Sequence, residues 1–379
     1  MVNPLLQLLE CGQSYWLDNL TRGMLTDGAL HQRVAEQGLR GVTSNPAIFH
    51  KAITGSHDYD EQITQLVRAG TSTYEIYERL VVDDVQDACD VLRPVYETSD
   101  GVDGFVSLEV SPYLAHDTQG TMAEARHLFA AVDRPNVCIK IPGTPEGVPA
   151  IHEMLYEGIN VNVTLLFDVK DYEAVALAYL TALERRVAAG LSIDRIASVA
   201  SFFLSRIDVL VDQLLHHRLP PKAGADEAAL PAQLLGKVAV ANAKLAYQCF
   251  QRLFSGVRWE ALQRHGARVQ RPLWASTSTK NPSYRDVCYV EPLIGPQTVT
   301  TLPEETITAF ADHGIVVPNS VTADVEEAQN IVGRDLAKVG IDLHYVTWQL
   351  LHEGVQKFLE PFDKLMQALT DKQQALGQG

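Results

Sequence analysis

Eight short apolar runs alternate with longer amphipathic runs along most of this chain of 379 residues. The alternation is typical of parallel βα units, because consecutive parallel strands are joined by a crossover that is usually helical. Eight is also the number of such units that closes a barrel. The expected strands are SYWLDNL (14–20), GLRGVTSNP (38–46), GFVSLEVS (104–111), NVCIKIP (136–142), GINVNVTLLF (158–167), RIASVASFF (195–203), RPLWAST (271–277) and VCYVEPL (287–293).

Polar residues within these strands distinguish a barrel from an open, doubly wound sheet. Strands of an open parallel sheet are covered on both faces and read as nearly continuous apolar runs. Here Glu109 and Asn162 alternate with apolar neighbours, and Lys140 and Asp18 interrupt other apolar strands. Barrel enzymes carry their chemistry on inward-facing polar residues near the strand ends. We therefore predict an α/β fold, a (β/α)8 TIM barrel with helical insertions and a C-terminal helical extension.

The chain is expected to form a single barrel domain over residues 1–379. Two stretches are longer than a βα unit needs, and we interpret them as helical insertions near 55–100 and 212–265. C-terminal helices are expected near 321–374. A small helical subdomain is the alternative interpretation of the insertions.

Composition limits the possible partners. The formal net charge is −16, which argues against nucleic acid or an anionic membrane as a partner. No uncharged apolar run approaches the ~20 residues that cross a bilayer, and the N-terminus has no basic segment of a signal peptide. Five scattered cysteines without a CxxC pair suit reduced thiols. We expect a cytoplasmic protein.

The stretch VCIKIPGTPEG (137–147) places Lys140 in the middle of an apolar strand. Such a lysine either reaches solvent at a half-exposed sheet or is a desolvated amine kept for chemistry. Inside a barrel, burial disfavours the ammonium form, and a neutral amine can attack a carbonyl to form a Schiff base. Proton transfer would then need a carboxyl group, for which Glu109 and Asp18 are candidates. The alternative for each carboxylate is a structural pair with an arginine.

Other polar residues near the expected strand ends are candidates for substrate binding. Asn45, Asn162 and Thr164 are candidates to hold substrate hydroxyl groups or an ordered water. Ser201 and Arg206 lie where a strand enters a helix, whose N-terminus favours anions.

A second hydroxyl-rich loop, WASTSTKNP (274–282), carries Ser276, Ser278 and Lys280 after the following strand. Paired loops of this kind at the end of a barrel sheet are a common phosphate site. Neither GxxxxGK[ST] nor a GxGxxG after a strand occurs, and no HxH or HExxH set is present. We expect neither a cofactor nor a metal.

Taken together, these motifs resemble those of transaldolases, in the longer bacterial form, over essentially the whole length. The matching segments, in the order of the family, are VTSNPAIF (42–49), SLEVSP (107–112), CIKIPGTPEG (138–147), EGINVNVTLLF (157–167), SFFLSRID (201–208), WASTSTKNP (274–282) and LLHEGVQKFLEPFDKLM (350–366).

The resemblance implies a metal-free transfer of a dihydroxyacetone unit in the non-oxidative pentose phosphate pathway. The donor would be fructose 6-phosphate or sedoheptulose 7-phosphate, and the acceptor erythrose 4-phosphate or glyceraldehyde 3-phosphate. Lys140 matches the Schiff-base lysine, and Asp18 matches the aspartate that takes the proton from the donor hydroxyl. Glu109 and Thr164 match the pair that holds a catalytic water. The expected partners are phosphorylated sugars, with no nucleic acid and no membrane, in a monomer or homodimer.

By the same resemblance, the remaining residues bind substrate. Asn45 and Asn162 match residues that bind the dihydroxyacetone hydroxyls, and Ser201, Arg206 and Ser276 match contacts near the barrel mouth. Shorter family members have a phosphate-binding arginine where this chain has Ser278, so Lys280 would have to supply that charge. A lysine lacks the bidentate geometry of arginine.

Two other functions stay open at this point. The same lysine would serve a fructose 6-phosphate aldolase that releases free dihydroxyacetone. A non-catalytic phosphosugar-binding barrel is the alternative from another class, although Lys140, Asp18 and Glu109 are all present.

Overall fold

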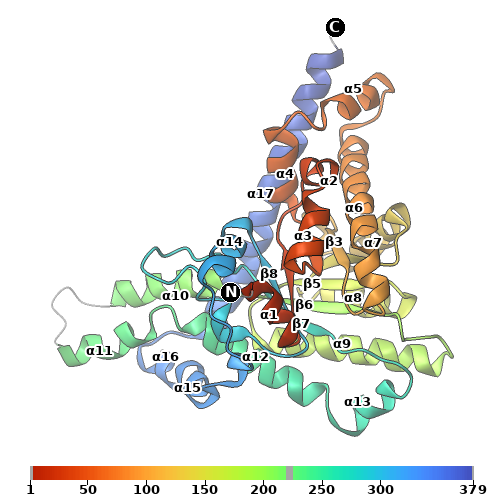
Figure 1. Ribbon diagram of the computed structural model, residues 1–379. Helices are drawn as coiled ribbons and strands as arrows, with labels where there is room; N and C mark the ends of the chain where they lie inside the picture. The colour runs from red at the N-terminus through yellow and green to blue at the C-terminus, as the bar shows by residue number, and fades with distance from the viewer. Residues whose placement is uncertain (1–2, 219–224, 378–379) are drawn as a thin grey trace.

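The computed structural model describes residues 3–218 and 225–377 and contains a closed barrel of eight parallel strands in chain order (Figure 1). The predicted (β/α)8 barrel is confirmed. β1 pairs with β8, which closes the sheet. The strands are β1 (Gln13–Leu17), β2 (Gly41–Thr43), β3 (Phe105–Glu109), β4 (Val137–Pro142), β5 (Val161–Leu166), β6 (Ser198–Phe203), β7 (Arg271–Ala275) and β8 (Thr298–Leu302).

The eighth strand is not the one predicted from the sequence. The segment 287–293 forms turns and a short 3-10 helix, Glu291–Leu293, while β8 follows at Thr298–Leu302. Pro292 lacks the backbone N–H that a central strand donates to its neighbour. The threonines of β8 are buried and β-branched, so they suit the interior of a barrel although their hydroxyl groups make the run look polar.

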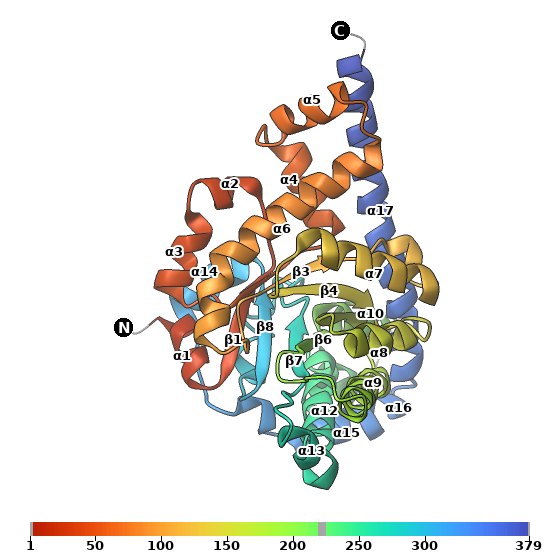
Figure 2. The same ribbon diagram turned by 90° about the vertical axis from the view of Figure 1, so that its right-hand side faces the viewer.

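Helices surround the barrel on its outer side, as Figure 2 shows. Their sequence signals are local: α6, for example, begins with a capping box between Ser72 and Glu75. The helices are α1 (Pro4–Glu10), α2 (Arg22–Thr26), α3 (Ala29–Gln37), α4 (Pro46–Gly55), α5 (Asp60–Arg68), α6 (Thr73–Thr98), α7 (Thr118–Val132), α8 (Gly147–Glu157), α9 (Val169–Ala188), α10 (Ser205–Arg218), α11 (Ala225–Leu234), α12 (Val238–Leu253), α13 (Gly256–Gln263), α14 (Glu304–His313), α15 (Val325–Asn330), α16 (Leu336–Lys338) and α17 (Leu343–Gly377).

The C-terminal helix α17 lies at the carboxyl end of the barrel strands. It packs against α4, α5, α6 and α10 and also contacts β5. In Figure 2 the arrows of β3 and β4 point toward it. The end of the chain therefore covers the face at which barrel enzymes carry their chemistry.

The register of the central strands aligns the polar residues. Glu109 of β3 lies opposite Lys140 of β4, which lies opposite Asn162 of β5. Since register partners on neighbouring strands point to the same face of the sheet, all three side chains share the inner face of the barrel. The register of β5 then shifts between Val163 and Leu166, and Leu165 has φ 61°. This bulge lies at the carboxyl end of the sheet, beside these three polar residues.

Candidate active site

Lys140 is buried at the carboxyl end of β4, with 5% of the residue exposed. Its Nζ donates a hydrogen bond of 2.9 Å to the Ser44 carbonyl oxygen and lies 3.4 Å from Oε2 of Glu109. The lysine is therefore no surface residue of a half-exposed sheet. Its amine is held between the second and third strands, next to a carboxyl group.

Glu109 and Thr164 have polar atoms that no other described residue satisfies. Apart from the ion pair between Lys140 Nζ and Glu109 Oε2 at 3.4 Å, both carboxyl oxygens of Glu109 and the hydroxyl of Thr164 are buried without a hydrogen-bond partner within the described residues. Burial raises the pKa of Glu109 above its ordinary value, and the charge of Lys140 opposes this. A buried group of this kind is costly without a partner. The arrangement fits the binding of a further polar group between the two residues.

Asp18 follows directly after β1 and is held by the next strand. The Thr43 hydroxyl donates a hydrogen bond of 2.9 Å to Oδ1 of Asp18, and lies 2.7 Å from the Thr301 hydroxyl. Burial raises the pKa of Asp18, while the charge of Lys140 and the Thr43 hydrogen bond oppose the rise. A carboxyl group in these surroundings can accept and return a proton.

Asn45 and Asn162 have structural contacts of their own. Asn45 is the N-cap of α4, and its Oδ1 accepts from the Ile48 backbone N–H at 3.1 Å. Asn162 is fully buried; its Nδ2 donates to the Ser107 hydroxyl, and its Oδ1 accepts from Ser201 at 2.7 Å. Asn45 and Ser201 line the cavity beside Lys140, and Asn162 supports Ser201 from behind.

Arg206 and Ser276 lie on the side of the cavity formed by β6 and β7. Nη1 of Arg206 is buried with no hydrogen-bond partner in the described part of the chain. Desolvation lowers the pKa of Arg206, and the charges of Glu109 and Asp18 oppose this. Ser276 has φ 55°, a conformation that is uncommon for a residue with a side chain, and its hydroxyl lies 2.8 Å from that of Ser205.

Ser278 and Lys280 do not join the other predicted residues. Nζ of Lys280 donates to the Ser278 hydroxyl at 2.8 Å, and the lysine is exposed. Neither residue lines the cavity beside Lys140. Lys280 is therefore not positioned to replace the arginine of the shorter family members in this conformation.

The cavity beside Lys140 has a volume of about 100 Å³. Phe358 of α17 lies over it, with its ring centroid 5.8 Å from Lys140 Nζ and 5.9 Å from Arg206 Cζ. The lining comprises the residues Asp18, Thr43, Asn45, Lys140, Thr164, Ser201, Phe203, Arg206, Ala275, Ser276, Thr301 and Phe358.

Five lining residues were not predicted from the sequence: Thr43, Phe203, Ala275, Thr301 and Phe358. Ala275 lies within the segment WASTSTKNP (274–282), which the sequence analysis singled out. Thr43 and Phe203 lie within motifs that were singled out, and Phe358 lies within the C-terminal segment 350–366. Only Thr301 had no signal, because it belongs to the strand that was missed.

The described residues contain no group of three or more histidine, cysteine or acidic side chains placed to hold a metal ion. Within the same ranges, no helix is long and apolar enough to cross a membrane.

A closed (β/α)8 barrel with a buried amine and two carboxyl groups at the carboxyl end of its strands belongs to the barrel enzymes. The model of the family described as Transaldolase/Fructose-6-phosphate aldolase matches residues 15–369. The chain therefore belongs to the transaldolase/fructose-6-phosphate aldolase family, and its relatives place it among the transferases of the transaldolase type. The resemblance inferred from the motifs is confirmed.

Three relatives illustrate the similarity. The chain is 51% identical over 374 residues to "Transaldolase 2" of Nostoc sp., with 98% of each chain covered. It is 48% identical over 375 residues to "Transaldolase" of Trichodesmium erythraeum, again with 98% of each chain covered. It is 48% identical over 373 residues to "Transaldolase" of Mycolicibacterium paratuberculosis, with 98% of this chain and 97% of the relative covered.

Proposed function

We propose that the protein transfers a dihydroxyacetone unit reversibly between phosphorylated sugars through a Schiff base on Lys140. The donor is fructose 6-phosphate or sedoheptulose 7-phosphate, and the acceptor is erythrose 4-phosphate or glyceraldehyde 3-phosphate, as in the non-oxidative pentose phosphate pathway. The observation that carries the proposal is the buried Lys140 amine, 3.4 Å from Glu109 at the carboxyl end of the barrel strands.

Imine formation is assigned to Lys140, Glu109 and Thr164. The Lys140 amine adds to the donor ketone, and the resulting carbinolamine loses water to give a protonated imine. Glu109 and Thr164 hold a water that carries protons to and from the carbinolamine oxygen. Their unpartnered buried oxygens support this assignment.

Carbon–carbon cleavage is assigned to Asp18. It removes the proton from the donor hydroxyl at C4, the C3–C4 bond breaks, and its electron pair flows into the iminium to form an enamine. The aldehyde product leaves, and an acceptor aldehyde then takes its place. Asn45 and Asn162 bind the hydroxyl groups of the dihydroxyacetone unit, for which Asn162 would give up one of its two hydrogen bonds.

Phosphate binding is assigned chiefly to Arg206. Its unpartnered Nη1 supports this role, because a guanidinium group that lacks a partner is available to an anion. Ser201 and Ser276 supply nearby hydroxyl groups. Ser278 and Lys280 would contribute only after their loop moves toward the cavity.

The enamine must wait for an acceptor without being protonated by water, so the site needs a cover. We assign this role to α17, since Phe358 lies over Lys140 and Arg206. The cavity of about 100 Å³ is smaller than the ~300–1,000 Å³ typical of ligand sites. Admission of a sugar phosphate therefore requires α17 or its neighbours to move outward.

The proposal is tested by trapping the imine. The protein is incubated with fructose 6-phosphate and borohydride, and modified peptides are mapped by mass spectrometry. A dihydroxyacetone-derived adduct on Lys140, lost in Lys140→Met, is expected. Lys244 offers a matched control, because it is also buried and donates to the Ala323 carbonyl oxygen at 2.7 Å, but lies outside the cavity. An adduct that persists in Lys140→Met and disappears in Lys244→Met would refute the assignment.

Transfer is separated from simple aldol cleavage by a product assay. Product is measured with and without erythrose 4-phosphate. A transaldolase forms sedoheptulose 7-phosphate and little free dihydroxyacetone, whereas a fructose 6-phosphate aldolase releases dihydroxyacetone without an acceptor. The absence of both products, with substrate bound, would favour a non-catalytic phosphosugar-binding protein.

We also propose a cytoplasmic location and a monomeric or homodimeric state. The five isolated cysteines, all free thiols, support a reducing compartment. Sedimentation of the purified protein would determine the oligomeric state.

A further inference from the structure

A second and larger cavity lies at the opposite, amino-terminal end of the barrel. Its volume is about 610 Å³, within the ~300–1,000 Å³ range of small-molecule sites. It is lined by residues at the start of several strands, among them Ser14 of β1, Cys138 of β4, Ser198 of β6 and Arg271 of β7. The reaction proposed above uses none of these residues.

The charge of this cavity is opposite to that of the protein. Its lining contains three guanidinium groups, those of Arg40, Arg268 and Arg271, against one carboxylate, Asp103. The chain as a whole has a formal net charge of −16. A cluster of positive charge within an acidic protein attracts anions locally, whatever the total charge.

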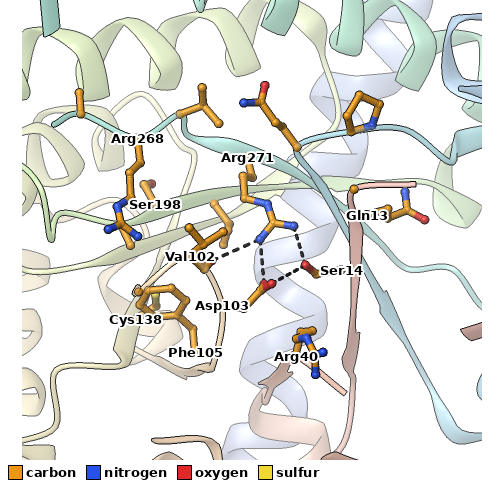
Figure 3. Close-up of a pocket in the computed structure, with 18 of the residues that line it drawn as sticks. Gln13, Ser14, Arg40, Val102, Asp103, Phe105, Cys138, Ser198, Arg268 and Arg271 are labelled. Atoms are coloured by element: carbon orange, nitrogen blue, oxygen red, sulfur yellow. Dashed lines mark hydrogen bonds and ion pairs between the residues drawn. The ribbon is translucent and has the colours of Figure 1, made fainter. Parts of the chain in front are cut away.

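Arg271 forms a rigid floor. It donates to Asp103 at 2.8 Å and to the Ser14 hydroxyl at 2.7 Å (Figure 3). It also donates to the Thr298 carbonyl oxygen at 2.7 Å. Only 7% of Arg271 is exposed, and its Nε has no partner within the described residues. Since Asp103 offsets the charge of Arg271, the lining keeps two further guanidinium groups that this carboxylate does not balance.

Arg268 and Arg40 each have N–H groups that no described residue accepts. Arg268 Nη2 pairs with Asp100 at 3.1 Å, but its Nη1 is buried without a partner in the described part of the chain. Arg195 shares the same carboxylate at 2.7 Å, and Asp194 lies nearby. Arg40 donates to the Leu39 carbonyl oxygen at 3.3 Å and forms no ion pair with any described residue. In Figure 3 Arg268 lies to the left of Arg271, and Arg40 lies below it, beneath Asp103 and Ser14.

The remaining wall is largely apolar and suits the body of a small organic molecule. It includes one indole, one phenyl ring and aliphatic side chains, with hydroxyl and amide groups between them. These residues are Leu9, Val102, Phe105, Val199, Trp259 and Val269, with Gln13, Ser14, Ser198 and Gln297. Apolar walls with a few charged or polar anchors are typical of metabolite sites.

We propose that this cavity is a second binding site, which takes a small organic anion bearing a phosphate or carboxylate group. Arg40 and Arg268 bind the anionic group, Arg271 and Asp103 form the fixed floor, and the apolar wall covers the rest of the ligand. The site is separate from the Lys140 cavity, so the proposal does not depend on the proposed function.

The test is calorimetric titration of the full-length protein with two probes, inorganic phosphate and citrate. Arg40→Gln and Arg268→Gln should each weaken binding of at least one probe by about tenfold or more, since each removes a charge-assisted contact. Arg195→Gln is the matched control, because it removes an arginine that pairs with Asp100 without lining the cavity. Arg206→Gln tests for phosphate binding in the Lys140 cavity, because binding there should weaken in this variant.

Binding that survives in Arg195→Gln and Arg206→Gln, and is lost in Arg40→Gln and Arg268→Gln, would establish the site. Transferase activity should stay at the wild-type level in the Arg40 and Arg268 variants, which shows that they fold. Binding lost only in Arg206→Gln would overturn the proposal. Equal affinity in all variants, or no binding of either probe by the wild-type protein, would overturn it as well.

Discussion

The Thr43 hydroxyl provides a direct test of the role of Asp18. It donates to Oδ1 of Asp18 at 2.9 Å and favours the ionised form of the carboxyl group, against the effect of burial. Thr43→Val keeps the shape of the side chain and removes this donor. The pKa of Asp18 should therefore rise further above its ordinary value.

The size of the effect follows from the kind of hydrogen bond that is lost. A hydrogen bond to a charged group contributes about 1.5–3 kcal/mol, and about 1.4 kcal/mol corresponds to one pKa unit. If Asp18 must be ionised to accept the proton, activity falls as pH drops through its pKa. The acidic limb of the kcat/KM profile should accordingly move to higher pH by about one to two units in Thr43→Val.

The assay is transfer from fructose 6-phosphate to erythrose 4-phosphate, followed across the acidic pH range. Thr301→Val is the matched control, because the Thr301 hydroxyl contacts Thr43 at 2.7 Å and has no hydrogen bond with Asp18. Its profile should stay near that of the wild type. A folded Thr43→Val protein with an unmoved acidic limb would refute Asp18 as the base that governs it.

Three further predictions concern the cover, the acid–base pair and stability. Glu109→Gln should slow borohydride-trapped imine formation by about 10²–10⁴-fold, because general acid–base catalysis contributes that much; an unchanged trapping rate would contradict the assignment. Phe358→Ala should raise the ratio of released dihydroxyacetone to transferred product, while Phe362→Ala, whose ring packs on Tyr77 outside the cavity, should leave the ratio unchanged. Burial raises the pKa of Asp208 to about 7. As pH rises from 5 to 7, the folded state still holds much of a proton that the unfolded state has released, so the wild type is destabilised by about 2 kcal/mol. The free energy of unfolding of Asp208→Asn, measured with denaturant at pH 5 and pH 7, should not show this decrease. The same pH dependence in both proteins would disprove the prediction.

Local sequence patterns were sufficient for most of the barrel. Seven of the eight expected segments contain a strand, since their apolar alternation and flanking helices are properties of neighbouring residues. The prediction of the eighth strand failed because β8 is rich in threonine and therefore looks polar. The burial of β8 depends on its pairing with both β7 and β1. Such closure is a long-range property that no local window contains.

The sequence alone also determined which residue types were available for chemistry: a lysine, two carboxyl groups and an arginine within or beside apolar strands. Only the tertiary structure decided which of them meet. The register of β3 and β4 places Glu109 opposite Lys140, and Phe358 reaches the same cavity from more than two hundred residues further along the chain. Lys280 carries the same charge as Lys140 but ends in solvent, because its loop turns away from the cavity. Composition and spacing identify candidates, whereas barrel closure, strand register and the path of α17 select among them, because burial and contact depend on the whole fold.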